Sequence, residues 1–289
     1  MNVVDKLVKL IRETSSSLPP DVLKALKTAL RKERKGSSAA VVLKTILDNC
    51  AIAAKRGTPL CQDTGTLTFF IDERLRRTVT PSVIGKAVAI ATEKGYLRKN
   101  TIDSVTGKSY DDNCAEGAPV VHYRGSSRSS GSGSSRPVVT LILKGGGSEN
   151  MSRQYSLPDA ALGAGRDLEG VRKCILDAVQ KIQGYGCAPG ILGVCIGGDR
   201  ATGYEVAKEQ LLRPLDEGAG LRVAGCEVAR LEKRLLREAN SLGIGPMGLG
   251  GKTTLLGVKI ASRPRVPASF FVTIAYMCWA CRRKSTVIL

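Results

Sequence analysis

Aromatic side chains are scarce in this sequence of 289 residues: they make up 4% of it, with one tryptophan and four phenylalanines. Proteins that bind single-stranded nucleic acid commonly stack bases on aromatic rings, so the shortage argues against such a surface. Histidine is scarcer still, since His122 is the only one. It has no partner at zinc-ligand spacing, and we interpret it as a structural or surface residue. Acid–base chemistry therefore has to use carboxylates, hydroxyls, lysines or a metal-bound water.

Long apolar runs are also missing. No stretch of 18 apolar residues occurs, which argues against a membrane-spanning helix. The first residues, MNVVDKLVKLIRETS, lack the apolar centre of a secretion signal and have the spacing of an amphipathic helix. We therefore expect a cytoplasmic protein.

Acidic residues are outnumbered by basic ones. The 44 lysines and arginines against 26 aspartates and glutamates give a net charge of +18. Such a charge attracts nucleic acid, acidic membranes, acidic partners or anionic substrates. The basic residues are spread along the chain rather than gathered in one block. A solvated basic surface is the favoured interpretation, and nucleic-acid binding is disfavoured.

Glycine and cysteine, in contrast, are plentiful, with 32 and nine residues. An odd number of cysteines without a secretion signal does not suggest a disulfide framework. We expect some of them to be small buried residues and others to be metal or cluster ligands.

The pattern of apolar residues predicts helices and strands without a clean β-α-β alternation, so the expected fold class is α+β, with mixed sheets, packed helices and glycine-rich loops. Predicted helices cover 3–13, 20–33, 39–55, 81–94, 168–183, 203–212 and 226–242, and Gly184 is expected to end the fifth. Predicted strands follow the segment GTPLCQDTG and cover 137–143, 191–198, 254–261 and 269–276. Residues 97–119 are expected to be rich in loops. We predict one domain over 1–289, with a flexible low-complexity insertion at 125–136.

The segment GPMGLGGKTT, residues 245–254, looks like a nucleotide-binding loop but fails the spacing test. The first glycine of a P-loop would fall on Pro246, which has no N–H to offer a phosphate. A helix precedes the segment and a strand follows it, the reverse of the order that a P-loop needs. The remaining interpretation is a glycine-rich loop that presents Lys252, Thr253 and Thr254 to a closely packed group.

Three other short segments have the composition of sites. In CQDTG, a thiol, an amide, a carboxylate and a hydroxyl crowd the turn before a strand, starting at Cys61. GYGCAPG places Cys187 in a similar turn before a buried strand. KGGGSEN follows a strand with three glycines, which allow close approach of a ligand or simply a tight turn.

The remaining cysteine pattern leaves several interpretations open. CWAC, residues 278–281, is a C-x-x-C pair without the context of a redox dithiol or of a complete zinc site. It is compatible with a cluster ligand. Cys174 lies on the apolar face of a predicted helix and Cys195 inside a predicted strand, so both are expected to be packing residues.

Taken together, several segments resemble the iron–sulfur hydro-lyases, that is, class I fumarate hydratases and L-tartrate dehydratases. The resemblance is to the alpha subunit of the two-subunit form, which is equivalent to the N-terminal half of the single-chain form. It extends from Pro59 to Arg283 and is carried by PLCQDTGT, LRKN, KGGGSEN with YSLPD, GCAPGILGVCIGG, GIGPMGLGGKTTLLGVKI and PASFFVTIAYMCWACRR.

The resemblance implies a 4Fe–4S cluster with Cys61, Cys187 and Cys278 as its protein ligands. Three thiolates leave one iron open to act as a Lewis acid toward a dicarboxylate substrate. The implied catalytic residues are Gln62 and Asp63. The implied substrate-binding residues are Arg98, Gly146, Gly147 and, with a role in supporting the cluster region, Lys252.

The resemblance also implies a beta subunit that completes the active site and an oligomer of the α2β2 type. The implied reaction is the reversible hydration of fumarate to L-malate; the alternatives are the alpha subunit of an L-tartrate dehydratase and a non-catalytic basic binding protein. The last is motivated by departures from the family pattern. Val266 stands where a histidine is usual, and Ser109-Tyr110-Asp111 where the family has Asn-Thr-Gly. Cys281 is either an incidental thiol or an alternative ligand.

Overall fold

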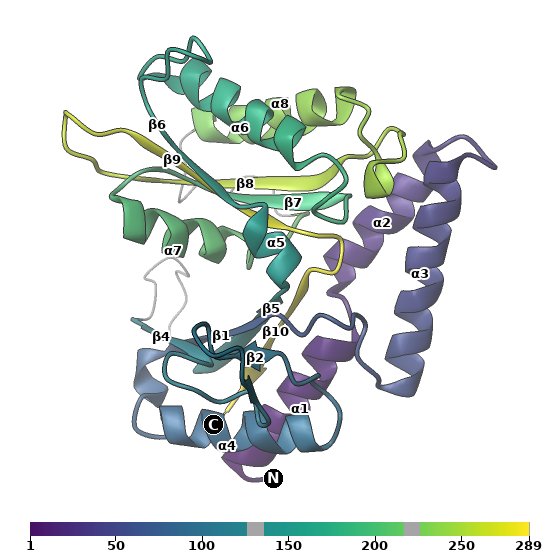
Figure 1. Cartoon of the computed structure of the whole chain (residues 1–289), viewed down its shortest axis with the longest axis vertical. Coiled ribbons are helices and arrows are strands. Elements are labelled where there is room, and N and C mark those ends of the chain that lie inside the picture. Colours follow the sequence, from purple (N-terminus) through teal and green to yellow (C-terminus); the bar gives the residue numbers. More distant parts are fainter. Residues whose placement is uncertain (126–135, 217–225, 289) are drawn as a thin grey trace. The chain divides into compact units, whose positions relative to one another are not determined.

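The computed structural model describes all residues except 126–135, 217–225 and 289, so most of the predicted insertion at 125–136 lies outside the described residues (Figure 1). The chain divides into two compact units. Unit 1 comprises Met1–Pro19, Asp48–Gly146 and Ala280–Leu289, and unit 2 comprises Pro20–Leu47 and Gly147–Trp279. One of the boundaries, between Leu47 and Asp48, falls inside the helix α3 (Ser38–Arg56).

Unit 1 is built on a mixed sheet of four strands in the order β10-β5-β1-β4. The strands are β1 (Thr66–Asp72), β4 (Val120–Arg124), β5 (Val138–Lys144) and β10 (Arg282–Val287). β1 and β4 are parallel, while β5 is antiparallel to both β1 and β10. A separate hairpin consists of β2 (Thr101–Ile102) and β3 (Ser109–Tyr110).

Two helices, α1 (Val3–Ser16) and α4 (Pro81–Glu93), pack together in unit 1, and α1 also contacts β5 and β10. A 3-10 turn, η1 (Glu73–Leu75), follows β1. The helix starts are fixed by side-chain caps, because Asn2 accepts a hydrogen bond from the N–H of Asp5 and Thr80 accepts one from that of Val83. Their apolar faces and the buried positions of β1 and β5 form one core.

Unit 2 contains a second mixed sheet, in the order β6-β9-β7-β8. Its strands are β6 (Arg153–Ser156), β7 (Gly190–Gly197), β8 (Leu255–Arg263) and β9 (Phe271–Met277). β7 is parallel to β8 and antiparallel to β9, and every residue of β7 is buried. The unbroken apolar run ILGVCIG reflects this central place, because a strand covered on both faces has no need of polar alternation.

Helices cover both faces of this sheet: α6 (Leu168–Ile182) and α8 (Cys226–Ser241) lie on one, and α7 (Arg200–Gln210) on the other (Figure 1). The helix α2 (Pro20–Lys32) packs against β8. Two short helical turns, α5 (Gly146–Asn150) and η2 (Pro246–Gly248), complete the described elements. No described helix combines the length and apolarity needed to cross a bilayer.

The expected α+β class is confirmed, and each predicted helix and strand is present within a few residues of its expected bounds. Two local expectations were wrong. KGGGSEN is not an open loop throughout, because residues from Gly146 onward form α5. The helix α6 ends at Ile182 and its C-cap is Gln183, with a left-handed φ of 47°, whereas Gly184 was expected to end the helix.

Candidate functional site

The CQDTG segment of unit 1 is held by its backbone on both sides of Cys61. The N–H of Leu60 donates to the carbonyl of Ser15 at 2.8 Å. The amide of Asn49 donates to the carbonyl of Leu60 at 3.0 Å. The carbonyl of Asp63 accepts from the guanidinium of Arg282 at 2.7 Å. Cys61, Gln62 and Asp63 are therefore presented on an anchored turn before β1, as the sequence predicted.

Arg98 lies beside this turn, and two buried polar side chains, those of Thr64 and Asn113, form hydrogen bonds with its backbone. The Thr64 hydroxyl accepts from the N–H of Arg98 at 2.8 Å and donates to its carbonyl at 3.1 Å. The Arg98 guanidinium reaches the Gln62 side-chain oxygen at 3.5 Å. Gln62, a predicted catalytic residue, and Arg98, a predicted substrate-binding residue, are thus neighbours.

Asn113 is the second of these side chains, and the sequence did not predict its role. Its side-chain oxygen accepts from the N–H groups of Asn100 and Thr101 at 2.9 and 3.1 Å. Its side-chain nitrogen donates to the carbonyl of Arg98 and the hydroxyl of Thr92, both at 3.0 Å. Asn113 is fully buried and has a φ of 61°. We call Thr64 and Asn113 the Arg98 bracket.

A cavity of about 260 Å³ opens beside Asp63 within unit 1. It is close to the lower end of the size range for small-ligand sites, roughly 300–1,000 Å³. Its polar lining consists of Asp63, Thr66, Asn100, Thr101 and Asn113, and backbone at Gly65 and Gly146 completes it. Asp63, a predicted catalytic residue, and Gly146, one of the predicted substrate-binding glycines, therefore line the same cavity.

Of the three consecutive glycines 145–147, Gly145 lies closest to the Asp63 side chain. A β-carbon at position 145 would lie 2.7 Å from the carboxylate Oδ2 of Asp63, while one at Gly146 would lie 3.9 Å from it. At Gly147 a β-carbon would meet nothing within 4 Å. The requirement for glycine is thus steric at position 145, and the space beside the Asp63 carboxylate is kept open by the missing side chain.

Two basic side chains are buried in unit 1. Arg282 is 1% exposed and Lys144 is 2% exposed. Arg282 donates to the Asp63 carbonyl, and its Nε has no hydrogen-bond partner among the described residues. Buried cations favour an anion nearby, which suits a site for a carboxylate.

In unit 2, the segments that carry Cys187 and Cys278 are joined to each other. The N–H of Trp279 donates to the carbonyl of Cys187 at 3.3 Å. The N–H of Cys278 donates to the hydroxyl of Ser148 at 3.1 Å, which ties the second segment to α5. Cys187 is exposed and has a left-handed φ of 52°. The two thiols predicted as cluster ligands in this unit therefore belong to adjoining loops.

Tyr276 lies beneath these loops. A β-carbon at Gly186 or Gly190, on either side of Cys187, would collide with its ring. Its hydroxyl has no hydrogen-bond partner among the described residues although the residue is 1% exposed. Burial, followed by the charges of the Cys278 and Cys187 thiols, raises the pKa of Tyr276 well above its ordinary value. The hydroxyl is therefore a permanent donor close to two thiols.

Most other described cysteines are suited to packing rather than ligation. Burial raises the pKa of the Cys50 and Cys195 thiols to about 11 and that of Cys174 to about 12. These thiols stay protonated, whereas a ligand has to be a thiolate. Cys174 and Cys195 are fully buried in α6 and β7, which confirms the packing role predicted for them. Cys281 is buried as well.

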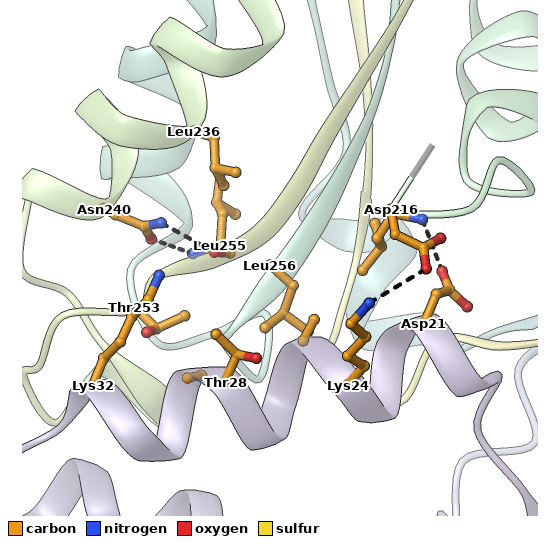
Figure 2. Close-up of a pocket in the computed structure, with 13 residues that line it drawn as sticks. Asp21, Lys24, Thr28, Lys32, Asp216, Leu236, Asn240, Thr253, Leu255 and Leu256 are labelled. Carbon is orange, nitrogen blue, oxygen red and sulfur yellow. Dashed lines mark hydrogen bonds and ion pairs between the residues drawn. The ribbon is translucent and has the colours of Figure 1, made fainter. Parts of the chain in front are cut away.

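The GKTT segment has a structural role in unit 2. Asn240 of α8 accepts from the N–H groups of Thr254 and Leu255 at 2.7 and 2.8 Å, and the N–H of Lys252 donates to Glu33 at 2.8 Å. A second cavity, of about 220 Å³, lies next to this segment (Figure 2). Thr28 and Lys32 of α2 lie on the side of Thr253, whereas Lys24 of the same helix pairs with Asp216 at 4.0 Å. No residue predicted for the site lines this cavity.

His122 lies in β4, where its ring stacks on that of Phe70 with centroids 5.1 Å apart. This agrees with a structural role for the only histidine.

The donors present fit a cluster ligand set in their chemistry. Cys61 and Cys278 are partly exposed and Cys187 is exposed, so all three thiols are accessible, and an orphaned hydroxyl donor lies near two of them. Cys61 belongs to unit 1 and the other two to unit 2. Within either unit, no three described His, Cys, Asp or Glu side chains are grouped so that they could hold a metal ion.

The family model described as fumarate hydratase (fumerase) matches residues 4–287. The chain belongs to the fumarate hydratase family.

Curated relatives of this family carry two kinds of name. A Geobacillus stearothermophilus protein named as a candidate class I fumarate hydratase is 47% identical over 284 residues, which cover 96% of this chain and 53% of that protein. A Methanocaldococcus jannaschii protein named as a candidate L(+)-tartrate dehydratase subunit alpha is 35% identical over 98% of this chain and 96% of its own length. The L(+)-tartrate dehydratase subunit alpha of Escherichia coli K12 is 28% identical over 99% of this chain and 91% of its own.

The chain thus spans about half the length of the Geobacillus relative and nearly the whole of the two alpha subunits. The names place this family among the hydro-lyases, and the words "subunit alpha" imply a partner subunit for those relatives. The sequence pointed to the hydroxyl of Thr64 as part of the CQDTG segment but gave no sign of Asn113, Tyr276 or Arg282, whose contacts appear only in the structure.

Proposed function

We propose that this chain is the alpha subunit of a 4Fe–4S-dependent hydro-lyase that catalyses the reversible hydration of fumarate to L-malate. The observation that carries the proposal is the cavity beside Asp63, whose lining includes Asn113, one of the two side chains that hold the Arg98 backbone by three hydrogen bonds. A carboxylate and a fixed arginine suit a reaction that moves a proton on a dicarboxylate.

In this proposal Cys61, Cys187 and Cys278 hold the cluster. When bound, it supplies an open iron that polarises the C–OH bond of malate. The chain's own residues do the rest. The Arg98 guanidinium binds a substrate carboxylate, Gln62 orients the hydroxyl, and backbone at Gly146 and Gly147 allows close approach. Lys252 supports the cluster region.

Asp63 carries the proton transfer. In the dehydration direction its carboxylate accepts the proton from the carbon next to the C–OH carbon. The electron pair of that C–H bond forms the C=C bond, and the hydroxyl leaves with the electron pair of the C–O bond. In hydration the same carboxyl returns the proton to carbon. No net oxidation or reduction occurs.

A beta subunit is part of the proposal, because the alpha chain spans about half of the Geobacillus relative. It would contribute further cationic groups to the dicarboxylate, in an α2β2-type assembly that we expect in the cytoplasm. The test is anaerobic reconstitution of this chain with its partner chain, iron and sulfide, followed by assays with fumarate, L-malate and L-tartrate. Turnover of fumarate and malate supports the proposal, and turnover of none of the three contradicts it.

L-Tartrate dehydratase is the second candidate, favoured by the near-complete coverage of two alpha subunits of that name. Turnover of tartrate alone would select it. The third alternative is a non-catalytic basic protein, and it is motivated by the residues that depart from the family pattern. Of these, Val266 is 65% exposed, and Asp111 forms an ion pair with Lys99 at 2.9 Å. Iron-free protein after anaerobic reconstitution, with salt-sensitive RNA binding, would favour that alternative.

A further inference from the structure

The buried hydroxyl of Tyr276 is left without an acceptor by the described residues. Tyr276 lies in β9, two residues before Cys278, and is 1% exposed. Native proteins satisfy nearly all their buried polar groups, and leaving one unpaired costs free energy. A fold that keeps this hydroxyl therefore indicates an acceptor that does not come from the polypeptide.

The position of the ring narrows the choice of acceptor. Tyr276 pairs with Leu192 in the β7–β9 ladder, and its ring and hydroxyl lie against Gly190, while the ring also lies against Gly186. These glycines flank Cys187, and the backbone of the Cys187 loop is joined to Trp279, next to Cys278. The hydroxyl thus lies under the loop that carries one proposed ligand and close to the other.

Sulfur is the acceptor that this environment offers. The ring of Tyr276 packs in the apolar core of unit 2. A buried water typically makes about two to four hydrogen bonds to polar groups, which an apolar core does not supply. A sulfide of a bound cluster can accept a hydrogen bond from a hydroxyl. Hydrogen bonds to the sulfurs are one of the means by which a protein sets the potential of an iron–sulfur cluster.

We propose that Tyr276 is a positioning residue whose hydroxyl donates a hydrogen bond to a sulfur of the iron–sulfur cluster held by Cys187 and Cys278. The proposal rests on the proposed function, which supplies the cluster. A donor of this kind raises the reduction potential, because it stabilises the more negative reduced cluster, and it slows cluster loss. Partners outside the ligand shell typically change metal affinity by about tenfold to a hundredfold.

Tyr276→Phe removes only the hydroxyl, and Tyr155→Phe is its matched control. Tyr155 lies in β6 of the same sheet, and its hydroxyl donates to Asp177 at 2.7 Å. In the cluster-free chain, Tyr155→Phe is expected to lower the unfolding midpoint in urea, whereas Tyr276→Phe leaves it unchanged or raises it. In the reconstituted α/β complex, Tyr276→Phe is instead the variant that has an effect. Tyr276→Phe lowers the reduction midpoint and speeds loss of the cluster absorbance in air by about tenfold, while Tyr155→Phe leaves both unchanged.

The two readouts separate this inference from the proposed function. If the wild-type complex takes up no cluster, the proposed function fails. If it takes up a cluster and Tyr276→Phe has the same potential, EPR spectrum and rate of cluster loss, only the inference about Tyr276 is overturned. It is also overturned if Tyr276→Phe destabilises the cluster-free chain as much as Tyr155→Phe, because the hydroxyl then has a partner within the protein.

Discussion

The side-chain nitrogen of Asn113 donates a hydrogen bond to the backbone carbonyl of Arg98 at 3.0 Å. Its side-chain oxygen accepts hydrogen bonds from the backbone N–H groups of Asn100 and Thr101. One buried amide thus fixes the course of the segment that presents the guanidinium. Because Arg98 is proposed to bind a substrate carboxylate, its affinity for the carboxylate is expected to depend on the side chains that hold its backbone.

Asn113→Ala is therefore expected to raise the KM for the dicarboxylate by about tenfold, with a smaller change in kcat, since binding in the ground state is affected most. Steady-state kinetics of the reconstituted complex measures this. Thr64 provides a graded comparison: Thr64→Ser keeps both hydrogen bonds to Arg98, and Thr64→Val loses them. An equal KM for the serine and valine variants would contradict the bracket's role.

Asp63 and Gly145 give a prediction about the open space beside the carboxylate. A methyl group at position 145 would lie 2.7 Å from Oδ2 of Asp63, and the carboxylate has to move aside because it is the flexible end of a side chain. Gly145→Ala is expected to reduce kcat by about tenfold to a hundredfold, since small misplacements of a reacting group cost that much, while thermal stability changes little.

Gly125→Ala is the matched control, because a β-carbon there meets nothing within 4 Å. Its activity and melting temperature are expected to equal those of the wild type. A Gly145→Ala enzyme with full kcat would show that the position of the Asp63 carboxylate does not limit the reaction.

The buried thiols predict how the chain responds to alkaline pH. Cys174 and Cys195 have folded-state pKa values of about 12 and 11, against about 8.5 for an unfolded cysteine. Because the folded state keeps the neutral thiol, the stability from this difference is fully present below pH of about 8.5 and is lost as the pH rises toward 11 and 12. The urea midpoint of the cluster-free chain should therefore fall between pH 8 and pH 10.

Cys174→Ala with Cys195→Ala should flatten this pH dependence, even though the variant is less stable at pH 7 because it loses buried side-chain volume. Alkylation by iodoacetamide at pH 8 gives a second measurement, in which exposed Cys187 reacts and Cys174 and Cys195 do not. An unchanged pH dependence in the double variant would contradict the assignment to these thiols.

The regular elements with apolar periodicity could be predicted from the sequence, and the polar ones could not. The strand β7 was predicted because all its residues are apolar or glycine, whereas β10 has the sequence RRKSTV and was missed. β10 is an edge strand that pairs only with β5, and polar side chains are normal at such an edge. Its strand conformation comes from pairing with a segment about 140 residues earlier in the chain, which local sequence does not encode.

The site shows the same division. Gly184 was expected to end α6 through a left-handed φ, but Gln183 adopts that conformation. Gly184 is needed for a different reason: a β-carbon there would lie 2.6 Å from the carbonyl of Met247. Motif residues such as Cys61 and Arg98 could be named from the sequence. Asn113 and Tyr276 could not, because a partner across the fold, or the lack of one, is a property of the tertiary structure.

The two cysteines of the CWAC segment are expected to differ in function. Cys278 is partly exposed, and its N–H donates to the Ser148 hydroxyl, whereas Cys281 is fully buried just before β10. Ligation of iron needs an accessible thiolate, so Cys278→Ala should abolish the broad cluster absorbance and the EPR signal of the reduced reconstituted complex. Cys281→Ala should keep both and should lower only the thermal stability, by about 1 kcal/mol for a small buried side chain. A variant at position 281 that folds but takes up no iron, beside a variant at 278 that still does, would assign the ligand to Cys281 instead.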